Sequence, residues 1–317
     1  MIRIAAPQIF FHRLNVIAFL AFVWFGFFAG NAPAQIFVVN YETGTIGKYA
    51  TSGATINASF ISGLSSPTGI AVSSDFLYVA QEDGIVRKYT TAGALVNSAL
   101  ITGLYLPWGL AVSGNELYVA NAGGPNSTVS KYTTGGALVN AALITGVDNP
   151  TGLAVSGNDV YVSEWSAGVV GKYTTSGTTI NASIASGLVY PGGLAVDDSG
   201  YLYVSSLYGG VRKYTTSGAL VNGLLIANSY NSGIGLAYDG NGHLLVANNY
   251  GGPGGNIIGM YTTSGAVVNA SFITGLNNPV AIAVLVPEPN TMVLALLGLG
   301  GLWWRGGSKR PLSLPAR

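Results

Sequence analysis

The chain has 317 residues, of which 49% are hydrophobic and 8% charged, with 46 glycines and no cysteine. A composition rich in Gly, Thr, Ser, Asn, Val and Tyr is typical of all-β proteins, and the missing cysteine excludes disulfides as a source of stability. Residues 35–286 hold seven basic and eleven acidic side chains, a net charge of −4. This segment therefore lacks the basic face that nucleic-acid binding requires.

Residues 1–34 have the three parts of a secretory signal peptide. Arg3 and Arg13 supply the positive start, the apolar run LNVIAFLAFVWFGFFAG follows, and APA, ending at Ala34, is a small-residue cleavage site. An uncleaved membrane anchor is the alternative. Both interpretations predict that the rest of the chain is exported.

The middle of the chain is a repeated unit. Its marker, a Lys-Tyr pair that becomes Met-Tyr once, recurs at spacings of 40, 43, 41, 41 and 47 residues, with the tyrosines at Tyr49, Tyr89, Tyr132, Tyr173, Tyr214 and Tyr261. One unit, LPWGLAVSGNELYVANAGGPNSTVSKYTTGGALVNAALITG, contains four short apolar runs separated by turn residues. Four strands in such a unit predict a β-propeller blade. We expect the lysines of the pairs to lie along an outer strand with their charge in water.

The two ends of the repeat region predict how the ring of blades closes. The first unit opens at IFVVN (36–40) without a preceding GLAV-type strand, and the last stretch supplies only PVAIAV (279–284). Each strand type then occurs six times. We therefore predict an all-β, six-bladed β-propeller over residues 35–286, with four strands per blade. Strand 279–284 is expected to pair with strand 36–40, which removes two open edges.

The units resemble NHL repeats, in which a P-x-G-[IL]-A-V strand precedes an [IL]-Y-V-A strand. SPTGIAV with LYVAQ, LPWGLAV with LYVAN and NPTGLAV with VYVSE carry the resemblance, which covers residues 36–284. The resemblance implies the propeller fold. It leaves the activity open, because propellers host many unrelated functions.

One face of the predicted propeller varies among the repeats, and we predict that it binds the ligand. The loops before the GLAV strands differ from unit to unit, whereas turns of the TTSGA type recur on the opposite face. Around the channel mouth we expect a ring formed by the residues that end the LYVA strands: Asn40, Gln81, Asn121, Glu164, Ser206 and Asn248. The same face is expected to gather aromatic residues: Tyr41, Tyr105, Trp108, Trp165, Tyr190, Tyr208, Tyr230 and Tyr250.

Aromatic rings beside amides suit glycan binding, because ring faces stack on C–H surfaces while polar groups bind hydroxyls. The alternative is that the rings only fill gaps between loops. Enzyme functions are also open. Glu164 with Asn121 and Asn248 offers oxygen ligands for a divalent cation, an arrangement that resembles gluconolactonase-like propellers but lacks a second acid.

Catalysis by histidine or by paired carboxylates has few candidate residues in this sequence. The lyase-type propellers that resemble this repeat use histidine, and residues 35–286 contain only His243, in a turn of the opposite face. Carboxylates for glycoside cleavage would have to come from Glu82, Asp83 or Glu164. We therefore predict no catalytic residues and no cofactor. The alternative is a metal-dependent lactonase-like or lyase-like enzyme with a bound divalent cation.

The last 31 residues have three parts in a fixed order. Pro287, Glu288 and Pro289 end the last strand, residues 291–304 are apolar and uncharged, and a basic end follows with Arg305, Lys309 and Arg310. The apolar run is shorter than the ~20 residues of a transmembrane helix. This order closely resembles the PEP-CTERM sorting signal of Gram-negative bacteria. The resemblance implies processing by a membrane exosortase and a host that makes exopolysaccharide. A plain C-terminal membrane anchor is the alternative.

Together these features predict an exported protein that contacts the membrane only through its terminal segments. The C-terminal segment would anchor it transiently at the inner membrane before it reaches the periplasm, the outer surface or the extracellular matrix. The predicted role is a non-catalytic binding or structural module of the cell envelope or exopolysaccharide matrix. Its partner on the loop-rich face would be a glycan or a surface protein.

Overall fold

The computed structural model describes residues 34–123, 127–227, 235–249 and 256–286. Both terminal segments lie outside these residues, including Pro287, Glu288, Pro289, Arg305, Lys309 and Arg310. Pro33–Val286 forms one compact unit, and every regular element described in it is a β-strand. The described part of the chain has no helix long and apolar enough to cross a membrane.

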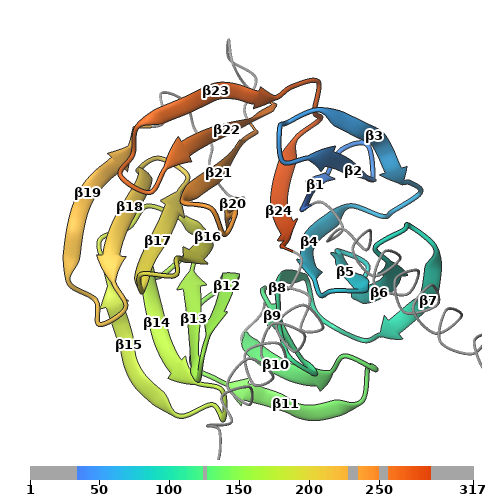
Figure 1. The fold of residues 1–317 in the computed structure, drawn as a ribbon. Helices are drawn as coiled ribbons and strands as arrows, with labels where there is room; N and C mark the ends of the chain where they lie inside the picture. Colours follow the sequence, from blue (N-terminus) through green and yellow to red (C-terminus); the bar gives the residue numbers. More distant parts are fainter. Residues whose placement is uncertain (1–33, 124–126, 228–234, 250–255, 287–317) are drawn as a thin grey trace, which may run out of the picture. The chain divides into compact units, whose positions relative to one another are not determined.

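The described strands form six four-stranded sheets arranged as a ring, which confirms the predicted six-bladed propeller (Figure 1). From the channel outward, blade 1 contains β24 (Pro279–Leu285), β1 (Gln35–Asn40), β2 (Thr45–Ala50) and β3 (Thr55–Ile61). Blade 2 contains β4 (Pro67–Val72), β5 (Phe76–Gln81), β6 (Ile85–Thr90) and β7 (Leu95–Ile101). Blade 3 contains β8 (Pro107–Ser113), β9 (Glu116–Asn121), β10 (Thr128–Thr133) and β11 (Leu138–Ile144).

The other three blades repeat this order. Blade 4 contains β12 (Pro150–Ser156), β13 (Asp159–Glu164), β14 (Val169–Thr174) and β15 (Thr179–Ala185). Blade 5 contains β16 (Pro191–Val196), β17 (Tyr201–Ser206), β18 (Gly210–Thr215) and β19 (Leu220–Ile226). Blade 6 contains β20 (Leu236–Tyr238), β21 (His243–Asn248), β22 (Ile257–Thr262) and β23 (Val267–Ile273).

The ring closes within blade 1, as the incomplete first and last units predict. β24 pairs antiparallel with β1, with Val38 opposite Ile282 and Gln35 opposite Leu285 (Figure 1). The two ends of the compact unit are therefore neighbours in one sheet. The backbone groups of β1 and β24 bind each other instead of forming two open edges.

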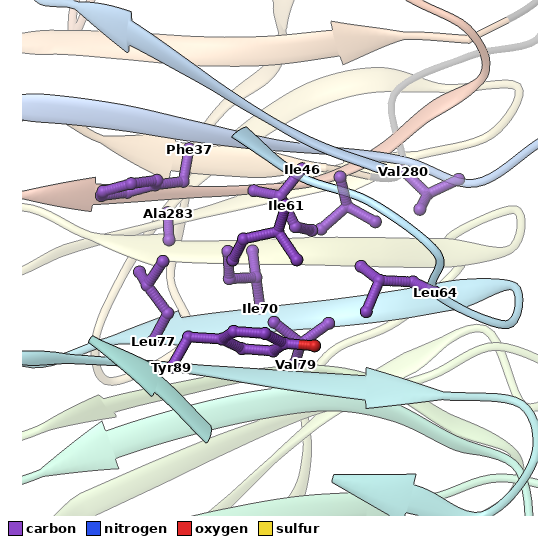
Figure 2. Packing of buried hydrophobic residues seen from close by; sticks show 11 residues of the cluster. Phe37, Ile46, Ile61, Leu64, Ile70, Leu77, Val79, Tyr89, Val280 and Ala283 are labelled. Carbon is purple, nitrogen blue, oxygen red and sulfur yellow. The ribbon is translucent and has the colours of Figure 1, made fainter. Parts of the chain in front are cut away.

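The core consists of six apolar clusters, one at each joint between neighbouring blades. At the joint of blades 1 and 2, Phe37 and Ile46 pack against Leu77 and Val79 (Figure 2). Second strands such as β5 are buried along nearly their whole length, because the neighbouring blades cover both faces of the sheet to which each belongs. This burial explains why LYVA-type runs are continuously apolar rather than alternating.

Lysines join the blades as well. Lys48 Nζ donates a hydrogen bond of 3.1 Å to the carbonyl oxygen of Thr91 in the next blade and lies 4.7 Å from the centroid of the Phe60 ring. Four equivalent bonds follow around the ring: Lys88 to Thr134 (2.9 Å), Lys131 to Thr175 (3.1 Å), Lys172 to Thr216 (3.1 Å) and Lys213 to Thr263 (3.2 Å).

The expectation that these lysines extend into water was therefore wrong. Each ammonium group lies over at least one aromatic ring and reaches a carbonyl oxygen of the neighbouring blade, where a charged donor forms a strong hydrogen bond. At the joint of blades 6 and 1 the equivalent position is Met260, which packs in the apolar cluster there.

Candidate functional site

The loop face is the face formed by the loops before the inner strands and by the turns between second and third strands. Five of the six loops end in a residue with positive φ directly before a proline: Ser66 (44°), Leu106 (43°), Asn149 (55°), Tyr190 (53°) and Asn278 (49°). The carbonyl oxygens of these residues accept hydrogen bonds from backbone N–H groups of the adjacent turns: Glu82 (3.2 Å), Ala122 (3.0 Å), Trp165 (3.1 Å), Leu207 (3.2 Å) and Tyr41 (3.1 Å), respectively. Each of these five loops thus forms one connected unit with its turn.

Three of the residues that end the second strands bind the backbone of these loops. Gln81 Oε1 accepts a hydrogen bond of 2.8 Å from the backbone N–H of Ser65. Glu164 Oε2 accepts one of 2.9 Å from Asp148 in the equivalent place. Asn40 Oδ1 accepts one of 3.2 Å from Asn277. A side-chain acceptor at this position satisfies a loop N–H that has no strand partner.

The expected ring of exposed side chains around the channel mouth is not what the structure shows. Asn40, Gln81, Glu164 and Ser206 are buried. Asn121 is also buried, and its amide donates to Ser130 Oγ at 2.7 Å within its own blade. Asn248 is half-buried. Asn40, Gln81 and Glu164 thus support the loops, and the five buried side chains do not line an open mouth.

The channel is narrow, with a cavity of about 80 Å³ at the starts of the inner strands, and Trp108 in β8 lines it together with Thr68 and Thr151. Trp108 thus lies in the channel wall at the end nearest the loop face, and not among the loops themselves. Its strand begins at Pro107, two residues before the GLAV run, with a register shift between Pro107 and Leu110. Ligand pockets for drug-sized molecules are usually about 300–1,000 Å³, so a glycan would have to bind outside the channel.

Glycines keep the channel narrow. A Cβ atom on Gly69 would clash with the carbonyl oxygen of Trp108, and one on Gly152 with that of Gly192. The inner strands of neighbouring blades approach each other too closely there for any side chain. This close approach is the physical reason for the glycine of the P-x-G pattern.

Three of the predicted aromatic residues form one exposed group, the aromatic cluster of Trp165, Tyr190 and Tyr208. The Trp165 and Tyr190 rings are stacked, with centroids 5.1 Å apart and planes at 25°. The Tyr190 and Tyr208 centroids are 6.1 Å apart, with planes at 59°. Tyr190 and Tyr208 are 43% and 58% exposed, and Trp165 is half-buried. The cluster spans the turn after β13, the loop before β16 and the turn after β17.

The loop beneath the cluster has a support that the sequence did not reveal. Arg212 Nη1 in β18 donates a hydrogen bond of 3.2 Å to the carbonyl oxygen of Gly187, three residues before Tyr190. The repeat pattern places Arg212 directly before the Lys-Tyr pair, but nothing in that pattern links it to the loop. Only the fold brings β18 and the loop together.

The other predicted aromatic residues have separate surroundings. Tyr105 is 64% exposed in the loop before β8, and among the described residues no ring contact joins it to the cluster. The Tyr41 hydroxyl donates to Glu82 Oε1 at 2.7 Å. Tyr230 and Tyr250 lie outside the described residues.

Glu164 carries the most perturbed carboxyl environment near the cluster. Burial raises its pKa, and the nearby Asp148 charge adds to the rise. Burial and the same Glu164 carboxylate raise the pKa of Tyr173 to about 12. Both changes follow from placing a carboxyl group beneath a loop with little access to water.

The residues considered for a divalent cation do not fit a shared site. Glu164 is turned to the backbone of the loop before β12, and Asn121 is turned to Ser130 of its own blade. In the part of the chain that the structure describes, no three His, Asp or Glu side chains come together in a way that could hold a metal ion.

The remaining candidates for catalysis also have local partners. Glu82 accepts the Tyr41 hydroxyl, and Asp83 Oδ1 accepts the N–H of Ile85 at 3.2 Å within its turn. His243 Nδ1 lies 2.9 Å from Asp239 Oδ2 on the opposite face. These residues are not assembled into one site by the fold.

Comparison with known proteins supports the fold alone. No protein-family model matches the chain, and a search of curated proteins finds no match. A nidogen/laminin complex is similar in structure, with a TM-score of 0.66 and 14% identity over 80% of this chain and 98% of that chain. A protein of unknown function from Bacteroides caccae has a TM-score of 0.63 and 15% identity over 80% of this chain and 99% of that chain.

A third similar structure is virginiamycin B lyase from Staphylococcus aureus. Its TM-score is 0.54, with 20% identity over 68% of this chain and 73% of that chain. At these identities the likeness shows a shared β-propeller architecture. The function must be argued from the site itself.

Proposed function

We propose that the protein is an exported, non-catalytic binding module of the cell envelope or exopolysaccharide matrix, and that the aromatic cluster holds a glycan on the loop face. The observation that carries this proposal is the exposed row of Trp165, Tyr190 and Tyr208 across two blades. Pyranose rings present flat C–H surfaces, and aromatic faces bury such surfaces with little loss of side-chain freedom.

The support beneath the cluster favours binding. The carbonyl oxygen of Tyr190 accepts from Leu207, that of Asn149 accepts from Trp165, and Arg212 holds Gly187. Because the loops are tied to the blades before any ligand arrives, little ordering remains to be done on association. A preorganised surface binds more tightly than a flexible one with the same contacts.

Export and sorting remain part of the proposal. The signal peptide would direct secretion, and an exosortase would process the tail at Pro287-Glu288-Pro289. A surface protein is the competing ligand, since the similar nidogen structure is a complex with laminin. The exposed parts of the Tyr190 and Tyr208 rings favour the glycan, because ring surfaces open to water can stack on the C–H faces of sugars.

The test is a glycan array followed by calorimetry on residues 35–286, a closed ring with a core at every joint. We expect Trp165→Ala and Tyr208→Ala each to weaken glycan binding about tenfold, the loss of roughly 1.4 kcal/mol of aromatic contact. Tyr105→Ala is the matched control: it removes an exposed tyrosine of the same face outside the cluster. Equal losses in all three variants, or binding unaffected by the cluster variants, would contradict the proposal.

A further inference from the structure

The loops and turns of the loop face carry acidic residues and no basic ones. The segments in question are 41–44, 62–66, 82–84, 102–106, 122–127, 145–149, 165–168, 186–190, 207–209, 227–235, 249–256 and 274–278. Their sequence contains the acids Glu42, Glu82, Asp83 and Asp148, and no Lys, Arg or His. Glu42, Asp83 and Asp148 are exposed. The buried Glu164 adds a fifth acid at the end of β13.

Most basic residues of the described chain are directed away from the loop face. The five blade-joining lysines donate to carbonyl oxygens of the turns that follow the third strands, on the opposite side of the blades. Arg87 in β6 and Arg212 in β18 are half-buried, and Arg212 Nη1 is bound to the carbonyl oxygen of Gly187. The charged side chains of the loop segments are all carboxylates and outnumber these two arginines, so the field at the loop face is negative on balance.

Asp148 brings this charge to the edge of the aromatic cluster. Its backbone N–H binds Glu164, and its neighbour Asn149 accepts the N–H of Trp165. The Asp148 side chain is exposed, so the carboxylate stands in water beside the Trp165 end of the cluster. Aromatic faces also attract ammonium groups directly.

From these observations we infer that the glycan bound by the cluster carries free amino groups, as in a polymer of de-N-acetylated hexosamine, and is not an acidic polysaccharide. The inference rests on the proposed function. A protonated amino sugar offers a C–H face for stacking together with a cation for Asp148 and the ring faces. A uronic acid polymer would place its carboxylates against an acidic surface on which Arg212 is already bound to Gly187.

The experiment compares three oligosaccharides of equal length on residues 35–286 by calorimetry: a glucosamine oligomer, its N-acetylated form and a uronate oligomer. The first two share one backbone and differ only in the charge on nitrogen. At about 10 mM salt, where the Debye length is about 30 Å, we expect the amino oligomer to bind on the order of tenfold more tightly than the acetylated one. At about 1 M salt this preference should disappear, leaving the stacking contribution.

Two variants locate the charge effect. Asp148→Asn should weaken binding of the amino oligomer about two- to fivefold, the worth of an exposed ion pair, and leave the acetylated oligomer unchanged. Asp83→Asn removes an exposed carboxylate of the same face in blade 2 and should have a smaller effect. Thermal unfolding of both variants checks that the fold is retained.

The outcomes separate the two proposals. Equal or tighter binding of the uronate oligomer would overturn the amino-sugar inference and leave the glycan-binding proposal intact. Binding of the amino oligomer that survives Trp165→Ala would show non-specific ionic attraction and overturn the inference. No binding of any oligosaccharide would overturn the proposed function itself.

Discussion

Glu164 and Gln81 occupy equivalent places in two blades and accept the same kind of hydrogen bond from the loop backbone, at 2.9 and 2.8 Å. They differ in charge. Burial raises the pKa of Glu164, so the folded state favours its protonated form more than the unfolded state does. Its contribution to stability is thus fully present below the unfolded pKa and is lost as the pH rises through the higher folded pKa.

Replacing Glu164 by Gln should therefore stabilise the protein at neutral pH. The amide keeps the acceptor for Asp148 and removes a buried charge, so we expect a gain on the order of 1 kcal/mol in the free energy of unfolding. Near pH 4 the two proteins should be almost equally stable. Urea unfolding from pH 4 to 8 measures this, and parallel profiles for the two proteins would refute it. The reverse change, Gln81→Glu, should destabilise at neutral pH.

Leu106 is constrained by the conformation of its own backbone. It has φ of 43°, where the equivalent loop position in the next blade is Asn149 with φ of 55°. Positive φ is costly for a leucine and tolerated by asparagine. Leu106 is 37% exposed, so burial of its side chain contributes less to stability than burial of a leucine in the core would.

We expect Leu106→Asn to raise the free energy of unfolding by up to about 1 kcal/mol, because backbone strain is relieved at a small loss of apolar contact. Asn149→Leu should lower it by a similar amount. Thermal melting of both variants provides the comparison. The Leu106 side chain lies beside Gly123, and a lower melting temperature for Leu106→Asn would show that loss of its apolar contacts outweighs the relief of backbone strain.

At the scale of elements, the third strands connect the blades through their lysines. Lys88 has no acidic partner among the described ion pairs, and its ammonium group lies 2.9 Å from the Thr134 oxygen and 3.9 Å from the centroid of the Phe76 ring. The joint of blades 6 and 1 has Met260 instead. The same position at the joint between blades is therefore occupied by a hydrogen-bonded lysine in five blades and by an apolar methionine in blade 6.

Lys88→Met should destabilise the protein by about 1 kcal/mol, the loss of a charged hydrogen bond offset in part by a buried methionine. The size of the side chain is not the cause, since methionine already fits this position in blade 6. Chemical unfolding at low and high salt tests this. A loss that vanishes at high salt would point to exposed electrostatics rather than to a bond at the joint.

The outer strands present another element-scale problem, because they are exposed edges with aliphatic side chains and no charge. In β11, Leu138 and Val139 are 58% and 54% exposed. Asn140 Oδ1 binds the N–H of Ala142 in its own strand at 3.0 Å, and the register with β10 shifts there. Bulges of this kind hinder pairing with another chain.

We expect Asn140→Val to straighten β11 and to promote edge-to-edge association, seen as larger species in light scattering at raised concentration. Asn140→Asp keeps the acceptor and adds charge, so it should stay monodisperse. If both variants remain unchanged in size, the asparagine turn does not protect the edge.

Strand number, blade order and ring closure were predictable because they follow from hydrophobic periodicity repeated six times. The placement of Trp108 in the channel wall was not, because its strand begins at Pro107, two residues before the GLAV run, so that Trp108 belongs to the inner strand and not to the loop. The loop-supporting role of Glu164 and Gln81 was missed for a related reason. Whether a strand-end side chain faces solvent or a loop N–H depends on the path of a loop from a neighbouring blade.

At the scale of the whole molecule, both ends of the propeller leave it on one side. Gln35 is paired with Leu285, at the start of β1 and the end of β24, whereas the loop face lies at the opposite ends of these strands. A protein attached through a segment after Val286 would therefore present the aromatic cluster away from its attachment. This geometry suits a module held at a surface, because attachment through the proposed tail would leave the loop face directed away from that surface.

Attachment through the end of the chain should consequently leave glycan binding intact, while attachment through the loop face should block it. The chain has no cysteine, so single cysteines allow clean immobilisation on a sensor surface. Residues 35–286 fixed through a C-terminal tag, or through Ser74→Cys on the exposed turn between β4 and β5, should bind with the affinity measured in solution. Immobilisation through Ser166→Cys, exposed beside Trp165, should remove most binding capacity. Equal capacity in all three orientations would place the ligand site away from the cluster, because a surface touching Ser166 leaves no room for a polymer on the neighbouring rings.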